Sequence, residues 1–166
     1  LWTVPSLYAQ NDTEQKMIKS INQKSDVNER FQATLKLANF YKENNIQKAD
    51  SIRKVIIEKS RSLEDSLRFK ALFYNAEVSL ILGDLDDYNE YILACQPFLN
   101  KLTDPNIQFS VFRHLGYYHS NMQKYDVAEN YLRLSLEQSK AIRDFEKQSE
   151  SYRYLALNFM QTNQKD

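Results

Sequence analysis

The amino-acid sequence predicts an all-α protein, an α-solenoid in which antiparallel helix pairs stack one after another. Apolar residues recur at steps of three and four, which places them on one face of a helix. Only 2 Gly and 3 Pro occur in 166 residues, so hairpins and glycine-rich phosphate loops are not expected. The stretches 111–126 and 151–166 also match at a shift of 40 positions, which aligns Arg113 with Arg153 and Leu115 with Leu155.

The first half of the chain divides at residues that start or stop helices. After a first short helix, Asp26 with Glu29 predicts a helix start, and so does Ser62 with Asp65. In each pair the first side chain can cap free amides, and the acid suits the positive end of the helix. Asn45 lies at the break between two apolar runs. The helices expected here span about 13–23, 26–43, 46–60 and 64–82.

The second half repeats this organisation. Gly83 interrupts the pattern, after which Leu85, Tyr88 and Ile92 step along one helix face. Pro105 suits the first position of the next helix, because a proline there loses no hydrogen bond. The helices expected here span about 85–101, 105–122, 125–142 and 145–162.

Small residues recur at one position in the first helix of each pair, and a second set faces them from the second helix. The first set is Ala38, Ala76, Gly116 and Ala156, and the facing positions are Ala49, Tyr88 and Ala128. Two helices approach closely where a small side chain admits the neighbouring ridge. Because glycine costs a helix about 1 kcal/mol relative to alanine, Gly116 indicates such a contact.

These positions resemble the tetratricopeptide repeat family. Its pattern is an aromatic, then Leu-Gly, an aromatic, and two small residues in the second helix. The third unit matches it most fully, with Phe112, Leu115, Gly116, His119, Ala128, Leu132 and Ser135. The resemblance covers about 26–166 and implies about 3.5 repeats of about 40 residues, longer than the usual length of about 34. It further resembles the exported domains of this family that precede signalling output domains in Gram-negative bacteria.

The two ends of the chain suggest a larger protein. Residues 1–10 carry no charge and lean apolar, and Ala9 precedes the change to a polar composition. They are interpreted as a remnant of a signal peptide or as an apolar arm. We expect the repeat domain to span 12–166 and to continue beyond 166. The expected location is periplasmic or otherwise extracytoplasmic, with a cytoplasmic location as the alternative, and any membrane contact is expected only through missing segments.

A peptide-binding groove is implied by the resemblance, since the first helices of successive pairs line a concave face in this family. The repeat alignment places these residues on it: Lys36, Asn39, Lys70, Phe73, Tyr74, Glu77, Arg113, His114, Tyr117, Asn121, Arg153, Tyr154, Leu157 and Met160. Arg113 and Arg153 occupy equivalent positions and are suited to hold one carboxylate. Alternatively, the tyrosines merely pack between neighbouring repeats with their hydroxyls at the rim.

No constellation in the sequence indicates catalysis, a cofactor or a metal. His114 and His119 point about 140° apart on one helix, so they cannot share a metal ion; one is expected in the groove and one packed. The acids near Asp84 lack the spacing of a calcium loop and suit a helix start. Cys95 falls on an apolar face and is interpreted as a core residue. With 22 basic and 22 acidic residues, no nucleic-acid surface is expected.

The function expected is therefore a non-enzymatic domain that binds a protein or peptide, as the sensing or assembly arm of a bacterial signalling protein. One alternative is a cytoplasmic scaffold or dimerisation module. Another is an accessory fragment of an enzyme whose active site lies outside this chain. Leu155, Phe159 and Met160 lack an expected covering helix, so a homodimer through the C-terminal repeat is a further expectation.

Overall fold

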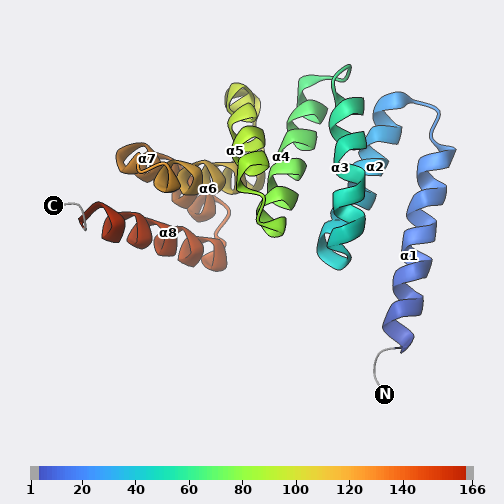
Figure 1. Ribbon diagram of the computed structural model, residues 1–166, viewed down its shortest axis with the longest axis horizontal. Helices are drawn as coiled ribbons and strands as arrows, with labels where there is room; N and C mark the ends of the chain where they lie inside the picture. The colour runs from blue at the N-terminus through green and yellow to red at the C-terminus, as the bar shows by residue number, and fades with distance from the viewer. Residues whose placement is uncertain (1–3, 164–166) are drawn as a thin grey trace. The chain divides into compact units, whose positions relative to one another are not determined.

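The computed structural model describes residues 4–163, with side chains from 12 to 162, and these residues form helices without a strand. The elements are α1 (Val4–Gln23), α2 (Val27–Asn44), α3 (Ile46–Ser60), α4 (Asp65–Leu82), α5 (Leu85–Ala94), the 3-10 helix η1 (Gln96–Lys101), α6 (Pro105–Asn121), α7 (Tyr125–Ala141) and α8 (Phe145–Asn163). Consecutive helices pack side by side within each half of the chain (Figure 1). The predicted all-α helical repeat fold is confirmed.

Two of the expected helices differ from the structure. The first begins at Val4 rather than near residue 13. The helix expected over 85–101 is not continuous, because α5 ends at Ala94 and the chain continues as η1. Pro97 explains this break: it has no amide hydrogen to donate, and its ring clashes with the carbonyl four residues earlier in an α-helix. The tighter 3-10 turn accommodates it near its N-terminus.

Several helix starts carry a side-chain cap, and the one expected at Asp26 is confirmed. The Asp26 carboxylate accepts the amide of Glu29 at 2.8 Å, and the Asn45 side chain likewise caps α3. Asp104 caps α6 and Pro105 occupies its first position. The start expected at Ser62 with Asp65 is wrong in its details, since the residue before α4 is Glu64 and no side chain caps the helix there.

Three turns between helices share one backbone conformation. Gly83, Gln123 and Arg143 have φ values of 77°, 58° and 55°, in the left-handed region. Each is followed by an amide that donates to the carbonyl five residues before it: Asp84 to Ser79 (2.9 Å), Lys124 to His119 (2.9 Å) and Asp144 to Ser139 (3.1 Å). This bond closes the helix end in the way typical of a glycine cap. The turn therefore repeats although the glycine does not.

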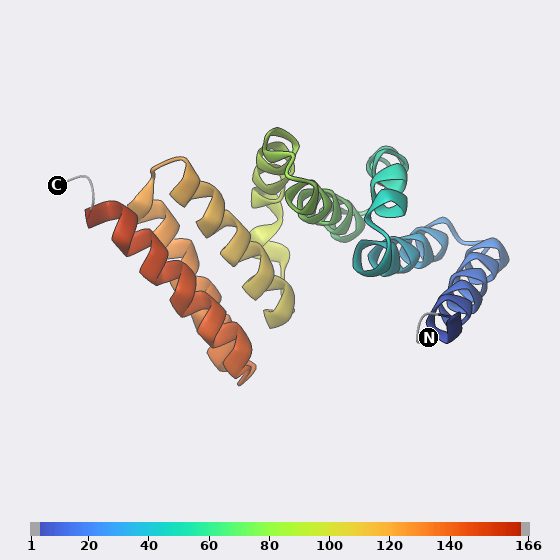
Figure 2. The same ribbon diagram turned by 60° about the horizontal axis from the view of Figure 1, so that its bottom comes forward.

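The chain divides into two compact units, Leu1–Tyr88 and Asn89–Asp166, with the boundary inside α5. In the first unit α1, α2, α3 and α4 pack in succession, and α2 also contacts α4. In the second, α6 packs on α7, α7 on α8, and α6 on α8 (Figure 2). The expectation of one repeat domain over 12–166 stays a prediction. This division suits a repeat protein, in which each element contacts only its near neighbours.

The first unit is held together by an apolar core and by polar contacts of one acidic residue of α1. The core includes Phe31, Leu35, Ala38, Ala49, Ile56, Leu67, Ala71 and Val78. The Glu14 carboxylate of α1 accepts the Tyr41 hydroxyl at 2.8 Å and the Lys48 ammonium at 2.6 Å. Both hydrogen bonds lower the pKa of Glu14, and the one from Lys48 has the larger effect. Burial, and then the bond to Glu14, raises the pKa of Tyr41 to about 12.

The small residues mark close helix contacts in both units, with one exception. Ala38, Ala76 and Gly116 are buried, as expected. A Cβ added at Gly116 would lie 2.6 Å from Cδ2 of Leu132, so only glycine fits between α6 and α7 without a shift. Ala156, the equivalent position in α8, is exposed, which contradicts the expectation. No helix among the described residues covers that face of α8.

Candidate functional site

The residues predicted to line a groove in the first unit do not form one cluster. Lys36, Asn39 and Lys70 are exposed on α2 and α4. Glu77 is partly buried and pairs with Lys42 at 2.5 Å, which ties α4 to α2. The first three side chains lie on the surface, and Glu77 holds two helices together. Among the described residues they do not gather into a binding site.

Tyr74 is a core residue rather than a groove residue, which corrects the prediction. Its side chain is almost completely buried, and its hydroxyl donates to the carbonyl of Ala49 at 3.1 Å. Burial raises the pKa of the Tyr74 phenol. For this tyrosine the structure agrees with the alternative of packing between neighbouring repeats, but its hydroxyl is buried on Ala49 instead of lying at the rim.

Arg113, a predicted groove residue of the second unit, lies among aromatic rings and one carboxylate. Its guanidinium carbon lies 5.9 Å from the centre of the Phe109 ring and 5.8 Å from that of Tyr154. Its Nη1 lies 3.1 Å from Oε1 of Glu150 on α8, and its side chain is 18% exposed. Arg113 therefore bridges α6 and α8, held by aromatic faces and by one carboxylate.

Arg153 joins the same group from α8. It is 64% exposed, and its Nη2 lies 3.9 Å from Oε1 of Glu150. Its guanidinium carbon lies 5.0 Å from the centre of the Tyr154 ring, and the Tyr154 and Tyr117 rings meet edge to face at 6.1 Å. We call Arg113, Tyr117, Glu150, Arg153 and Tyr154 the α6–α8 patch.

The two histidines differ from expectation. His114, predicted to face the groove, is buried and lies with Nε2 3.1 Å from Nη2 of Arg113. Asn121 is exposed near the end of α6 and lies outside the patch. His119 is packed, as one of the two was expected to be, and stacks on Tyr131 with ring centres 5.4 Å apart. Neither ring nitrogen of His119 has a hydrogen-bond partner. Burial is the main cause that lowers the pKa of His119, and the positive charge of Lys124 lowers it further.

Glu150 is the patch residue that the sequence analysis missed. Its position three residues before Arg153 is a recognisable helical pair and offered one signal. Its contact with Arg113 has no such local signal, because it depends on how α8 packs against α6. The two arginines predicted to hold a ligand carboxylate both lie near the carboxylate of Glu150, Arg113 at 3.1 Å and Arg153 at 3.9 Å. The binding of a ligand carboxylate stays a prediction.

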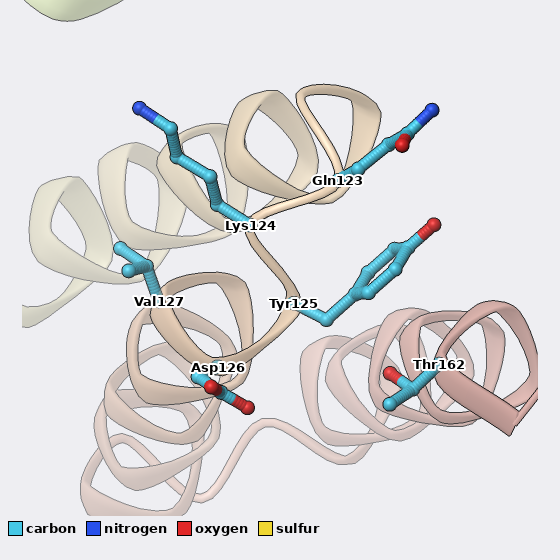
Figure 3. A pocket seen from close by; sticks show the side chains of 6 residues that line it. All are labelled: Gln123, Lys124, Tyr125, Asp126, Val127 and Thr162. Carbon is cyan, nitrogen blue, oxygen red and sulfur yellow. The ribbon is translucent and has the colours of Figure 1, made fainter. Parts of the chain in front are cut away.

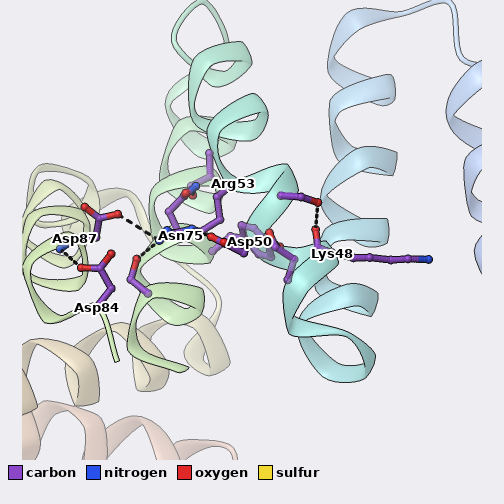
Figure 4. A network of polar contacts seen from close by, with 11 residues as sticks. Lys48, Asp50, Arg53, Asn75, Asp84 and Asp87 are labelled. Carbon is purple, nitrogen blue, oxygen red and sulfur yellow. Dashed lines mark hydrogen bonds and ion pairs between the residues drawn. The ribbon is translucent and has the colours of Figure 1, made fainter. Parts of the chain in front are cut away.

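A second polar cluster lies in the first unit around Arg53 (Figure 4). The Arg53 guanidinium pairs with Asp50 at 2.9 Å and with Asp87 at 3.4 Å, and it donates to the hydroxyl of Ser79. The acids predicted to start α5 have that role in part, because Asp84 accepts the amide of Asp87 at 3.2 Å. The cluster links α3, α4 and the start of α5, and it is accounted for by their packing.

A pocket of about 410 Å³ lies beside the turn between α6 and α7 (Figure 3). Its lining consists of Gln123, Lys124, Tyr125, Asp126, Val127 and Thr162. The side chains of Lys124 and Gln123 extend outward from the turn in Figure 3. This lining brings together neither a nucleophile with a base nor a set of metal ligands.

The described residues hold no group of three or more His, Cys, Asp or Glu side chains that could bind a metal ion. Cys95 is buried, as expected. None of the helices in the described part of the chain is long and apolar enough to span a bilayer. Comparisons with models of protein families, with curated proteins and with solved structures found no match for this chain.

Proposed function

We propose that this chain is a non-enzymatic helical-repeat domain that binds a protein or peptide through the α6–α8 patch. The observation that carries the proposal is the position of the Glu150 carboxylate, whose Oε1 lies 3.1 Å from Arg113 and 3.9 Å from Arg153. A site that accommodates one carboxylate between two guanidinium groups has the charge and the geometry to accept a carboxylate from a ligand. The preferred ligand is a peptide with an acidic side chain or a free carboxyl terminus.

The aromatic side chains of the patch support the same proposal. Tyr117 and Tyr154 offer flat, amphipathic surfaces beside the charge, and such residues with arginine dominate tight peptide interfaces. Arg113 already contacts the rings of Phe109 and Tyr154, so little side-chain entropy is lost when it binds. Glu150 is only 31% exposed and is displaced, or shares its arginines, when a ligand carboxylate arrives.

The proposal is tested by fluorescence anisotropy with short labelled peptides that differ only in acidic residues and in a free or amidated terminus. Arg153→Ala removes an exposed guanidinium and is expected to weaken binding of the acidic peptides about tenfold, the value of one charge-assisted contact. Arg133→Ala is the matched control, because Arg133 is 63% exposed and also pairs with a nearby glutamate. Equal affinities for acidic and amidated neutral peptides would contradict the proposal.

A broader variant tests the patch as a whole. Substitution of Arg113, Tyr117 and Arg153 together by Ala is expected to abolish peptide capture while far-ultraviolet circular dichroism still reports the helices. Glu150→Gln removes the internal competitor and is expected to tighten binding of acidic peptides. Weaker binding by this variant would mean that Glu150 orients Arg113 instead of competing for it.

We also propose that the domain is the extracytoplasmic sensing or assembly arm of a larger bacterial signalling protein. The support is the uncharged, apolar composition of residues 1–10, together with the resemblance of the repeat units. N-terminal sequencing of the protein made from the full-length gene tests the location. A mature chain that begins near Gln10 is expected, whereas retention of residues 1–10 would favour a cytoplasmic scaffold.

A further inference from the structure

The end of α6 is anchored by a single buried side chain. In the stretch 117–124, which comprises the last turn of α6 and the turn that follows it, His119 is buried and every other residue is partly buried or exposed. Residues 121–124 are all exposed, and Gln123 holds a left-handed φ of 58°, a conformation that favours glycine. A segment with so few buried contacts belongs to the least stable part of a fold, so its attachment depends on His119.

The surroundings of His119 suit a neutral imidazole and not a charged one. Its ring stacks on Tyr131 of α7, with ring centres 5.4 Å apart, and meets the Tyr118 ring of α6 edge to face at 4.9 Å. Neither ring nitrogen has a hydrogen-bond partner. The charged group that acts on the ring is Lys124 of the turn, which is itself positive. A proton taken up here would add a charge and a second N–H donor without an acceptor for either.

Two effects favour a charged ring at this place, and both are weaker than the cost of burying the charge. The face of Tyr131 attracts a cation, and His119 lies in the last turn of α6, where the backbone carbonyls carry partial negative charge. Removing an unpaired ion from water outweighs contacts of this kind. The pKa of His119 is lowered accordingly, by burial first and then by Lys124. Protonation therefore favours a state in which the ring reaches water.

The equivalent helix end in the first unit is anchored differently. At the shift of 40 positions, His119 corresponds to Ser79 and Tyr118 to Val78, and both of these residues of α4 are buried. The Ser79 hydroxyl accepts a hydrogen bond from the guanidinium of Arg53. Neither side chain changes its charge between about pH 5 and 8, so the end of α4 lacks a titrating anchor and serves as an internal reference.

From this arrangement we propose that His119 is a pH-sensitive switch: when its ring takes up a proton, the segment 117–124 separates from α7 while the rest of the second unit stays folded. The protonated ring is then hydrated, and the left-handed backbone at Gln123 is released. The opening needs no ligand, and it goes beyond the proposed peptide binding.

The separating segment carries two contacts to α8. The Tyr117 ring meets Tyr154 edge to face at 6.1 Å, and the Ser120 hydroxyl donates to Oε1 of Gln161 at 2.8 Å. Opening therefore removes Tyr117 from the α6–α8 patch and loosens the hold on a bound peptide. This consequence, unlike the opening itself, rests on the proposed function: acid is expected to release the ligand.

Hydrogen exchange followed by NMR at about pH 7.5 and 5.5, corrected for the intrinsic exchange rates, tests the opening. The reporters are the amides of Met122, Gln123 and Lys124, which donate to carbonyls in the last turn of α6. Their protection is expected to fall about tenfold at the lower pH, which lies about one unit below the ordinary pKa of an exposed histidine. The amides of Gly83 and Asp84, which close the end of α4, should keep their protection.

A variant and a titration complete this test. His119→Phe keeps an aromatic ring in place of the imidazole but cannot take up a proton, so its reporters should be equally protected at both pH values. Wild-type reporters that do not change would overturn the inference. The NMR titration of the His119 ring needs no variant: a ring that takes up its proton while the reporters stay protected would show that Tyr131 and the helix carbonyls hold the charge in place, which also overturns it.

The release of a ligand is measured separately, by the dissociation rate of a labelled acidic peptide. Dissociation should become several-fold faster at pH 5.5 in the wild-type chain and not in His119→Phe, because the carboxylates of the peptide, with an ordinary pKa of about 4, stay ionised at both pH values. Equal acceleration in both chains would contradict the control of the patch by His119. A peptide that does not bind even at pH 7.5 would contradict the proposed function, and the exchange measurement still decides the switch.

Discussion

Replacement of Gly116 by alanine opposes two effects of similar size. Alanine favours a helix by about 1 kcal/mol relative to glycine, so the change should stabilise α6. The new Cβ, however, would lie 2.6 Å from both Cγ and Cδ2 of Leu132 and 3.3 Å from the carbonyl oxygen of Ala128. Leu132 is 1% exposed, so it is enclosed by core side chains that are packed closely. Such overpacking costs about 1–3 kcal/mol, so we expect the free energy of unfolding to fall by about 1 kcal/mol.

A double-mutant cycle with Leu132→Ala isolates the contact. Leu132→Ala alone should cost about 2–5 kcal/mol, because it leaves a cavity in the core. In that background Gly116→Ala no longer meets a side chain and should stabilise the protein by about 1 kcal/mol through helix propensity. The effect of Gly116→Ala thus changes sign, and the coupling energy between the two positions is about 2 kcal/mol.

Urea denaturation followed by circular dichroism measures these free energies. Ala156→Gly is the matched control, because Ala156 holds the equivalent position in α8 and is exposed, so it reports helix propensity without a clash. It should cost about 1 kcal/mol. A Gly116→Ala variant that is more stable than the wild type would refute the close approach of α6 and α7.

Three other perturbations have defined outcomes. Gln123→Gly should raise the free energy of unfolding by about 0.5–1 kcal/mol in urea, because it relieves a left-handed backbone. Gly83→Ala, in the equivalent turn between α4 and α5, should lower it. Because the pKa of His119 is lowered, the neutral imidazole's contribution to stability is complete above its ordinary pKa of 6.5 and is lost as the pH falls below it. His119→Phe should therefore flatten the dependence of the melting temperature on pH across that range. The lowered pKa of Glu14 likewise gives stability above its ordinary value of 4.5 that is lost on acidification, and Glu14→Gln should remove this dependence while Lys48 keeps its charge.

The helices were predictable because their signals are local. Periodic apolar residues, the cap at Asp26, the proline at 105 and the interruption at Gly83 act within a few residues of one another, and the structure begins or ends a helix at each of these places. The break before Pro97 was equally local, and the ring chemistry of proline would have predicted it. The repeat at a shift of 40 also identified Gly116 as a contact point before any partner was known.

The α6–α8 patch was only half predictable. The repeat placed Arg113 and Arg153 on equivalent helix faces, and the structure brings both to the same carboxylate. That this carboxylate belongs to Glu150 depends on the packing of α8 on α6. Periodicity likewise gave Tyr74 and His114 a helix face, but whether that face is covered depends on the neighbouring helix, and both side chains proved to be buried.

By itself, then, the sequence determined the helices, their faces and the positions of close approach, because these follow from interactions between residues a few positions apart. The tertiary structure alone decided which faces are covered. Ala38, Ala76 and Gly116 are buried and Ala156 is exposed, although all four hold the same place in their repeats. Burial is a property of two elements together, so a repeated residue has a repeated environment only where its neighbour is repeated as well.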